Sequence, residues 1–271
     1  MHTNLQPQGT GNMLSLGHIE ICGIPVSTVS RVRVLEQIRE KIAQKKLGNY
    51  ISITNTESMY HALRIKAHFD YIRGANFSLC DGVGVILAGL FWGHILTRYN
   101  GPILQLDCCD YGQVCEWRHF FYGGKEGVAE KMADRLSEHF PHMIVAGTYC
   151  PPFRDLSPEE DAFVVAMINA TQPDIVWVGL GLLKQEQWIA RHLNRLEATW
   201  MIGVGGSFDY HSGAVPWAPK WIRALGMEWL FRLLVQPRLR AKRYWWSLVF
   251  VIEAAVKGAK IRFARIVKCL G

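Results

Sequence analysis

Short runs of apolar, β-forming residues alternate along this chain with longer segments in which apolar residues recur at helical spacing. The short runs predict buried strands at 19–26, 50–53, 77–80, 120–122, 143–148, 174–178 and 200–204. The periodic segments predict helices at 28–46, 57–73, 103–117, 127–140, 158–171 and 184–196. This alternation predicts an α/β fold, a Rossmann-like three-layer sandwich on a mostly parallel sheet.

Two of the predicted helices begin at recognisable capping residues. Thr28 or Ser30 can cap the helix at 28–46. Ser157, followed three residues later by Glu160, forms a capping box before the helix at 158–171. Both signals favour helices over strands in these segments.

Four of the predicted strands run directly into glycine. The residues that follow them are Asp81-Gly82, Gly123-Gly124, Gly179-Leu180-Gly181 and Gly205-Gly206. Glycine by itself permits tight turns. The carboxyl ends of parallel strands, however, share the edge where open α/β sheets bind ligands, and backbone N–H groups in such turns attract anions. The repetition therefore favours a ligand that carries phosphate.

Polar side chains accompany these glycines at the same predicted edge. Lys184, Gln185 and Glu186 begin one helix, and Ser207 and Asp209 follow a double glycine. Gly124, Gly205, Gly206, Ser207 and Asp209 are therefore candidate substrate-binding residues. Asp81 stands at the end of an apolar strand, where an aspartate can cap a turn or do chemistry. Its place at the shared edge favours the second role.

After Pro219 the chain becomes strongly basic. Residues 219–271 hold five Lys and seven Arg against Glu228 and Glu253, a net charge of +10, whereas the whole chain carries +7. Such a segment suits an anionic partner: nucleic acid, anionic lipid or a phosphorylated substrate. The expected organisation is a flexible leader at 1–18, an α/β catalytic domain at 19–218 and a basic amphipathic appendage at 219–271.

The apolar centre of this appendage, 244–256, includes Glu253 and is shorter than the roughly 20 apolar residues of a membrane span. Aromatic residues next to Lys and Arg favour a helix that lies on an anionic membrane surface. The alternative is a helix that packs on its own domain or on another subunit. The apolar segment 86–96 can likewise pack against a second subunit, which makes a homo-oligomer possible.

The sequence offers no evident metal or cofactor site. Cys108, Cys109, Cys115 and His119 match no zinc spacing. The chain also lacks an Asp-x-Asp metal-binding motif, so we expect metal-independent chemistry without a cofactor. Seven cysteines without disulfide-scaffold spacing, and a polar N-terminus without a signal peptide, predict a reducing cytoplasm.

Four motifs, in order, resemble the WecG/TagA/CpsF glycosyltransferases (glycosyltransferase family 26). They are Asp-Gly-Val-Gly-Val from Asp81, Phe-Tyr-Gly-Gly-Lys-x-Gly-Val-Ala-Glu-Lys from Phe121, Pro-Asp…Gly-Leu-Gly-x-x-Lys-Gln-Glu-x-Trp-Ile from Pro173, and Ile-Gly-Val-Gly-Gly-Ser-Phe-Asp from Ile202. The spacing of Ala218-Pro219 and Gly226-x-Glu228-Trp229-x-x-Arg232 is similar too. The resemblance covers residues 19–245.

The resemblance implies an inverting transferase that moves a hexose from a UDP-sugar, of the UDP-ManNAc or UDP-glucose type, to a polyprenyl-diphosphate-linked saccharide. Members act in cell-surface and exopolysaccharide biosynthesis. The resemblance also implies a peripheral location on the cytoplasmic face of the cell membrane. In that setting the partners are the UDP-sugar, the lipid-linked acceptor and the anionic membrane surface, and no nucleic acid is involved.

The resemblance also carries residue roles to matching positions. The general base of the family corresponds to Asp81, and Gln185 corresponds to a substrate contact. Thr54 and Asn55 match the first polar strand end of the family, which makes them candidate substrate-binding residues. Arg98 matches an arginine that precedes a Thr-Gly-x-Asp motif, which here reads Asn100-Gly101-Pro102-Ile103. The appendage arginines that help to close the active site correspond to Arg223, Arg232, Arg238 and Arg240.

Two other classes compete with this interpretation. A nicotinamide-dependent oxidoreductase would use glycine-rich strand ends, but the full Gly-x-Gly-x-x-Gly fingerprint is missing, because Lys184 and Leu87 stand where the third glycine belongs. A binding module without catalysis, for nucleic acid or membrane, would explain the basic and aromatic run 238–246. It would not explain an acidic, glycine-rich sheet edge.

Overall fold

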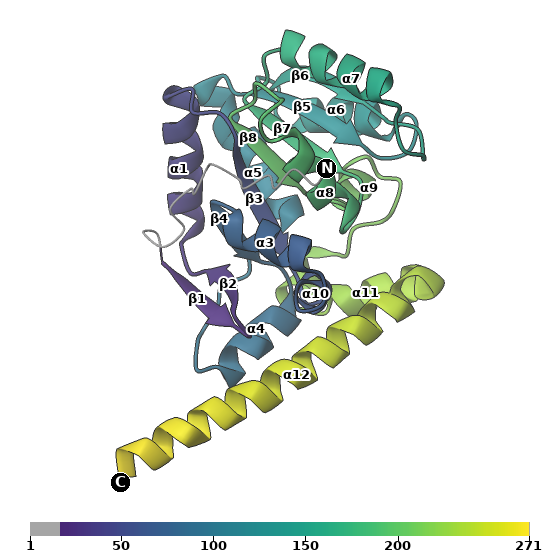
Figure 1. Cartoon of the computed structure of the whole chain (residues 1–271). Helices are drawn as coiled ribbons and strands as arrows, with labels where there is room; N and C mark the ends of the chain where they lie inside the picture. The colour runs from purple at the N-terminus through teal and green to yellow at the C-terminus, as the bar shows by residue number, and fades with distance from the viewer. Residues whose placement is uncertain (1–16, 271) are drawn as a thin grey trace.

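A computed structural model describes residues 17–270 of the chain and the side chains of residues 17–264. The predicted leader therefore lies outside the described residues except for its last two positions. Figure 1 shows an α/β body with a long C-terminal helix running beneath it.

The body is built on one parallel sheet of six strands. The strands are β3 (Asn49–Thr54), β4 (Phe77–Cys80), β5 (Arg118–Gly123), β6 (Ile144–Tyr149), β7 (Ile175–Gly179) and β8 (Trp200–Gly203). Their spatial order is β4-β3-β8-β7-β5-β6, and every pairing is parallel. The carboxyl ends of all six strands therefore lie along one edge, as the sequence predicts.

Helices cover both faces of the sheet, because successive strand residues point to opposite sides. In β7, Val176 and Val178 pack into one core, while Ile175 and Trp177 pack into the other. The first core takes in α2 (Thr56–Ala62), α3 (Lys66–Gly74), α7 (Pro158–Ala170) and α8 (Lys184–His192). The second takes in α1 (Arg31–Ala43), α5 (Gly101–Cys115), α6 (Val128–His139) and α9 (Ser207–His211). The predicted three-layer α/β fold is confirmed.

Both predicted caps are present. The side chain of Ser30 accepts a hydrogen bond from the backbone N–H of Arg33 at 3.3 Å, so Ser30 and not Thr28 begins α1. Ser157 and Glu160 form a complete capping box at the start of α7. These local signals need no tertiary context, which is why the sequence alone reveals them.

Two predicted elements are wrong in their extent. The segment 19–26 is not one strand but an antiparallel hairpin of β1 (His18–Ile21) and β2 (Ile24–Ser27), separate from the main sheet. Its turn is made by Cys22 and Gly23, both at positive φ. The segment 57–73 is not one helix, because Ile65 adopts an extended backbone (φ −125°) between α2 and α3. The break lets α2 bury Met59 and α3 bury Tyr71 and Ile72 in the same core.

The basic C-terminal segment folds into α10 (Lys220–Ala224), α11 (Glu228–Val235) and α12 (Pro237–Leu270). Phe250 and Ala254 of α12 are fully buried in the core. Trp246 stacks on Tyr60 of α2, with ring centroids 4.7 Å apart. This part of α12 therefore packs on its own domain, which was one of the two alternatives for the segment.

The apolar segment 86–96 lies mostly in α4 (Val83–Phe91), which packs beside α12 (Figure 1). The indole N–H of Trp92 donates to the carbonyl oxygen of Ala254 at 3.0 Å. Leu87, Leu90 and Phe91 nevertheless remain exposed, so contact with a second subunit stays a prediction. Within the described residues, every helix is too short or too polar to cross a membrane.

Candidate active site

A large cavity, of about 1630 Å³, opens at the carboxyl edge of the sheet. Residues that follow five different strands line it: Asn55 after β3, Asp81 after β4, Gly124 after β5, Gln185 after β7, and Gly205, Gly206, Ser207 and Asp209 after β8. α11 and α12 close the open side with Arg232, Arg240 and Arg243. The cavity therefore brings residues from Ile53 to Val251, up to 198 positions apart, together in one site.

Asp81 projects into this cavity from the end of β4. Its backbone N–H donates to the carbonyl oxygen of Thr54 at 2.9 Å, which continues the β3–β4 pairing by one residue. Burial raises the pKa of the Asp81 carboxyl, the guanidiniums of Arg232 and Arg98 oppose that rise, and Glu228 adds to it. The Arg98 Nε lies 4.0 Å from Asp81 Oδ1. Asp81 is thus a carboxylate with partial access to solvent, held close to two cations.

Glu228, at the start of α11, holds these two arginines together. Its two carboxylate oxygens accept separate hydrogen bonds, one from Arg98 Nη2 and one from Arg232 Nη2. The Glu228 side chain is only 5% exposed. Burial alone would raise its pKa, but the charges and hydrogen bonds of Arg232 and Arg98 outweigh burial and lower it. An ionised Glu228 therefore positions both guanidiniums beside Asp81.

The two predicted residues at the end of β3 have different environments. Asn55 lines the cavity, and its Oδ1 caps α2 by accepting from the backbone N–H of Ser58 at 2.9 Å. Thr54 is fully buried and does not line the cavity. Its hydroxyl lies 3.1 Å from the Ser52 hydroxyl and 2.8 Å from the Ser78 hydroxyl. Because adjacent strand residues point to opposite faces, only one of the pair reaches the site.

Gln185, at the start of α8, lines the cavity and has a buried side-chain oxygen without a hydrogen-bond partner among the described residues. Its Nε2 donates to Glu186 Oε1 at 3.0 Å, and its Oε1 has no hydrogen-bond partner among the described residues. Burial raises the pKa of Glu186 to about 7. Hydrogen bonds from the backbone of Glu186 itself, from the Gln185 amide and from the backbone of Leu183 lower the pKa but do not cancel this rise. Glu186 thereby orients the Gln185 amide and leaves its oxygen, which can only accept, without a partner.

The turn after β8 supplies backbone and acidic groups on the other side of the cavity. Gly205 adopts φ +48°, a conformation that other residues rarely tolerate. The Ser207 hydroxyl donates to Gln105 Oε1 and is fully buried. Burial raises the pKa of Asp209, opposed by the charges of Arg240 and Lys125. The turn therefore faces cations from both α12 and the β5–α6 loop.

The four predicted appendage arginines divide into two pairs. Arg232 and Arg240 line the cavity. Arg223 instead lies over the ring of Trp217, with its guanidinium carbon 3.8 Å from the ring centroid, and Arg238 is exposed. Neither Arg223 nor Arg238 lines the cavity.

The sequence analysis missed a third arginine of the appendage that lines the cavity, Arg243. Its Nε donates to both carboxylate oxygens of Glu57, at 3.0 and 2.7 Å. The role of Glu228 was also missed. Its spacing four residues before Arg232 on a helix was the available signal.

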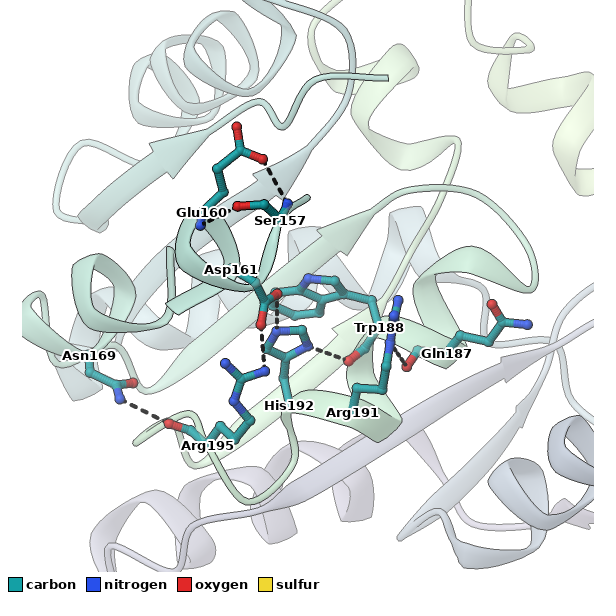
Figure 2. Close-up of polar contacts among 9 residues, drawn as sticks. All are labelled: Ser157, Glu160, Asp161, Asn169, Gln187, Trp188, Arg191, His192 and Arg195. Carbon is teal, nitrogen blue, oxygen red and sulfur yellow. Dashed lines mark hydrogen bonds and ion pairs between the residues drawn. The ribbon is translucent and has the colours of Figure 1, made fainter. Parts of the chain in front are cut away.

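The cavity extends away from Asp81 toward the junction of α7 and α8. Figure 2 shows the imidazole of His192 between the carbonyl oxygen of Trp188 (2.7 Å) and the carboxylate of Asp161 (2.9 Å). Arg195 binds the other oxygen of Asp161. Burial lowers the pKa of His192, while the Trp188 carbonyl and Asp161 oppose that shift. This network ties two helices together at the outer end of the cavity, and none of the predicted site residues belongs to it.

The chemical character of the site follows from these groups. A carboxylate with a raised pKa can take a proton from a hydroxyl. Clustered arginines can stabilise a diphosphate. Across residues 17–264, no three His, Cys, Asp or Glu side chains lie close enough together to hold a metal ion. The groups present therefore suit transfer chemistry on a phosphorylated substrate.

Comparison with known proteins agrees with the motifs. The sequence model of the WecG/TagA/CpsF family of glycosyl transferases matches residues 19–263. A protein of Staphylococcus aureus, called N-acetylglucosaminyldiphosphoundecaprenol N-acetyl-beta-D-mannosaminyltransferase, is 30% identical over 249 residues, which cover 91% of this chain and 96% of that protein. A protein of the same name in Bacillus subtilis is 29% identical over 218 residues, covering 80% and 83%. The chain belongs to the WecG/TagA/CpsF glycosyl transferase family.

Proposed function

We propose that this family member transfers an N-acetylhexosamine of the ManNAc type from a UDP-sugar to a saccharide linked to polyprenyl diphosphate, with inversion at the transferred carbon. The names of the relatives in S. aureus and B. subtilis support the sugar and the acceptor. The observation that carries the proposal is the position of Asp81. Its carboxylate faces a cavity large enough for two substrates and stands beside arginines that suit a diphosphate.

The proposed reaction is a single displacement. The acceptor hydroxyl oxygen attacks the anomeric carbon of the donor sugar, and the bond from that carbon to the UDP oxygen breaks. Asp81 takes the hydroxyl proton, and UDP leaves with the electron pair. Attack from the face opposite the leaving group inverts the configuration at the anomeric carbon. A base in hydrogen-bond reach of the acceptor and a cationic site for the diphosphate are the two requirements of this scheme.

The arginines and the glycine turns fit the second requirement. Arg232 and Arg240 approach from the C-terminal helices, and the turn containing Gly205 and Gly206 lies across the cavity. Guanidinium groups and backbone N–H groups both bind phosphate oxygens well. We place the UDP diphosphate between them, with the free oxygen of Gln185 accepting from a sugar hydroxyl or from the acetamido N–H.

We also propose that the protein works at the cytoplasmic face of the membrane. Trp221, Trp229 and Trp245 are each about half exposed or more, and Lys220, Arg238 and Lys242 lie near them in the chain. Exposed indoles next to cations suit the interface of an anionic bilayer. Binding to nucleic acid is less well supported, because three arginines of the appendage, Arg232, Arg240 and Arg243, line the cavity.

The test is a turnover assay with purified protein, EDTA, a panel of UDP-sugars and a short-chain polyprenyl-diphosphate-GlcNAc acceptor. We expect UDP release that requires acceptor and is fastest with UDP-ManNAc. Asp81→Asn should lower kcat by at least a hundredfold, the usual contribution of general base catalysis, and still bind UDP in a calorimetric titration. No acceptor-dependent UDP release with any donor would overturn the proposal, and loss of UDP binding in Asp81→Asn would overturn the role of the base.

A further inference from the structure

One part of the cavity lining is apolar and leads away from Asp81. Val83 and Leu87 of α4 and Leu248 and Val251 of α12 all line the cavity. We call these four residues the apolar lane. The inner end of the lane adjoins Asp81 and Gly82, which are the two residues that precede Val83 in the chain. Apolar side chains offer no hydrogen-bond partners to the polar groups of a sugar or a nucleotide, so the lane does not favour binding of either.

The lane opens onto exposed apolar surface at its outer end. Leu87 is 43% exposed and Leu248 is 51% exposed. Beyond Leu87, α4 continues with exposed apolar residues at helical spacing, Leu90 and Phe91. Figure 1 shows the two helices side by side along this stretch. The lane therefore includes apolar side chains that reach the surface of the protein.

Tight contacts hold the walls of the lane together. A Cβ atom at Gly84 would lie 2.6 Å from Thr56 Cγ2 and 3.5 Å from Val251 Cγ2, so only glycine lets α4 approach α2 this closely. At the other end, Trp92 Nε1 donates to the carbonyl oxygen of Ala254. The lane is thus a built feature of the fold, fixed at both ends.

Cations stand where the lane meets the polar part of the cavity. Arg240 and Arg243 project from α12 one to two turns before Leu248, and Arg232 projects from α11. A ligand that fits both parts must carry an anionic group joined directly to a hydrocarbon chain. A polyprenyl diphosphate has this construction, and the names of the relatives include undecaprenol.

We propose that the apolar lane binds the first isoprene units of the acceptor lipid and guides the acceptor saccharide to Asp81. The inference rests on the proposed function and adds the site for the chain. Removing one methylene group from water is worth about fourfold in affinity. Burial of even part of an isoprene unit in the lane should therefore change the specificity constant on the order of tenfold.

The experiment compares two acceptors with the same sugar diphosphate, one bearing a ten-carbon isoprenoid chain and the other a methyl group. Both are used in solution without vesicles or detergent, so that membrane binding cannot contribute. We expect the wild-type protein to favour the isoprenoid acceptor in kcat/KM by at least about tenfold. Leu248→Asn should move this ratio toward one, whatever the effect of the substitution on overall rate.

Ile252→Asn is the matched control. Ile252 lies one turn further along α12, is 55% exposed and does not line the cavity. We expect the ratio of this variant to equal that of the wild type. A ratio that is unchanged in Leu248→Asn, or lowered equally in both variants, would overturn the proposal that the lane binds the isoprenoid chain.

A second readout separates the lane from the proposed function. Geranyl diphosphate is titrated into each variant and its binding is followed by calorimetry. Binding that is weakened in Leu248→Asn and retained in Ile252→Asn supports the lane even if no turnover occurs with any acceptor, an outcome that would reject the transferase proposal alone. Equal binding of geranyl diphosphate by both variants would overturn the proposal that the lane binds the isoprenoid chain.

Discussion

Glu228 is the residue whose replacement tests most directly how the C-terminal helices complete the active site. Glu228→Gln keeps the shape of the side chain and removes its charge. Arg98 and Arg232 then share one acceptor oxygen instead of two, although their side chains are only 19% and 25% exposed. Removing one partner from a buried ion pair typically costs about 3 to 5 kcal/mol. We expect a loss of that size in the free energy of unfolding at neutral pH.

The loss should depend on pH in a defined direction. The pKa of Glu228 is lowered in the folded protein from the ordinary value of 4.5. Its contribution to stability is therefore present above pH 4.5 and disappears as the pH falls through the lowered pKa. The difference between wild type and Glu228→Gln, measured by urea unfolding, should be full at pH 7 and shrink in acid.

The same substitution should move the pH profile of turnover. The charge of Glu228 raises the pKa of Asp81, so its removal lets the two arginines lower that pKa further. Asp81 then stays ionised at more acidic pH, and the acid limb of kcat/KM shifts to lower pH. A profile that stays in place would contradict the assignment of that limb to Asp81.

Glu253→Gln is the control for the unfolding experiment. Glu253 also links α12 to an arginine of the domain, Arg64, but the two side chains are 31% and 36% exposed. A pair with this exposure is worth less than about 1 kcal/mol. Equal destabilisation by both substitutions, or a loss below about 1 kcal/mol in Glu228→Gln, would refute the view that burial makes the Glu228 cluster important.

Three further substitutions test single features of the site and fold. Glu186→Gln should stabilise the protein at pH 8 by up to about 3 kcal/mol. The reason is that the folded state raises the pKa of Glu186 from 4.5 to about 7 and so disfavours its ionised form. In urea unfolding, this gain in stability should vanish near pH 4.5. Gly179→Ala places a Cβ atom 2.5 Å from the buried Phe208 ring and should cost about 1 to 3 kcal/mol, visible as a lower Tm. Ser157→Ala removes the cap of α7 and should cost about 1 kcal/mol, with Glu159→Gln, which keeps the cap, as its control in thermal unfolding.

The sheet and the location of the site were predictable from the sequence because both depend on short-range patterns. Apolar runs that end in glycine identify the carboxyl ends of strands, and parallel strands bring those ends to one edge. Asp81, Gln185 and Gly205 follow from this argument without any coordinates, and the structure places all three in one cavity.

The partners across the cavity were not predictable in this way. Arg98 and Glu228 are 130 residues apart, and Arg243 and Glu57 are 186 residues apart. Only the packing of α11 and α12 on the domain brings each pair together. A similar limit applies to Thr54 and Asn55, because a sequence does not show which of two successive residues at a strand end points into the site.

The structure of α12 explains why its sequence supported two interpretations at once. Phe250 and Ala254 face the domain core, whereas Leu248 and Ile252 are exposed, so apolar residues occur on opposite faces of one helix. A purely interfacial helix would show one apolar stripe, and a purely internal one would show no exposed leucine next to cations. The pattern suits a helix that packs on its own domain and offers a second face to lipid.

This double role bears on how the active site is assembled. The ion pair of Arg243 with Glu57 is only partly exposed, so much of its attraction is offset by the loss of hydration. Apolar packing of α12 on the domain, which includes the burial of Phe250 and Ala254 and the stacking of Trp246 on Tyr60, then supplies much of the free energy that holds α12 in place. Because Arg240 and the wall of the apolar lane belong to the same helix, the cationic part of the cavity and the proposed path for the lipid exist only while α12 is packed on the domain. The chain thus links the completion of this cavity to the apolar packing of α12, in which Phe250 and Ala254 lie on the helix face opposite the one proposed to meet lipid.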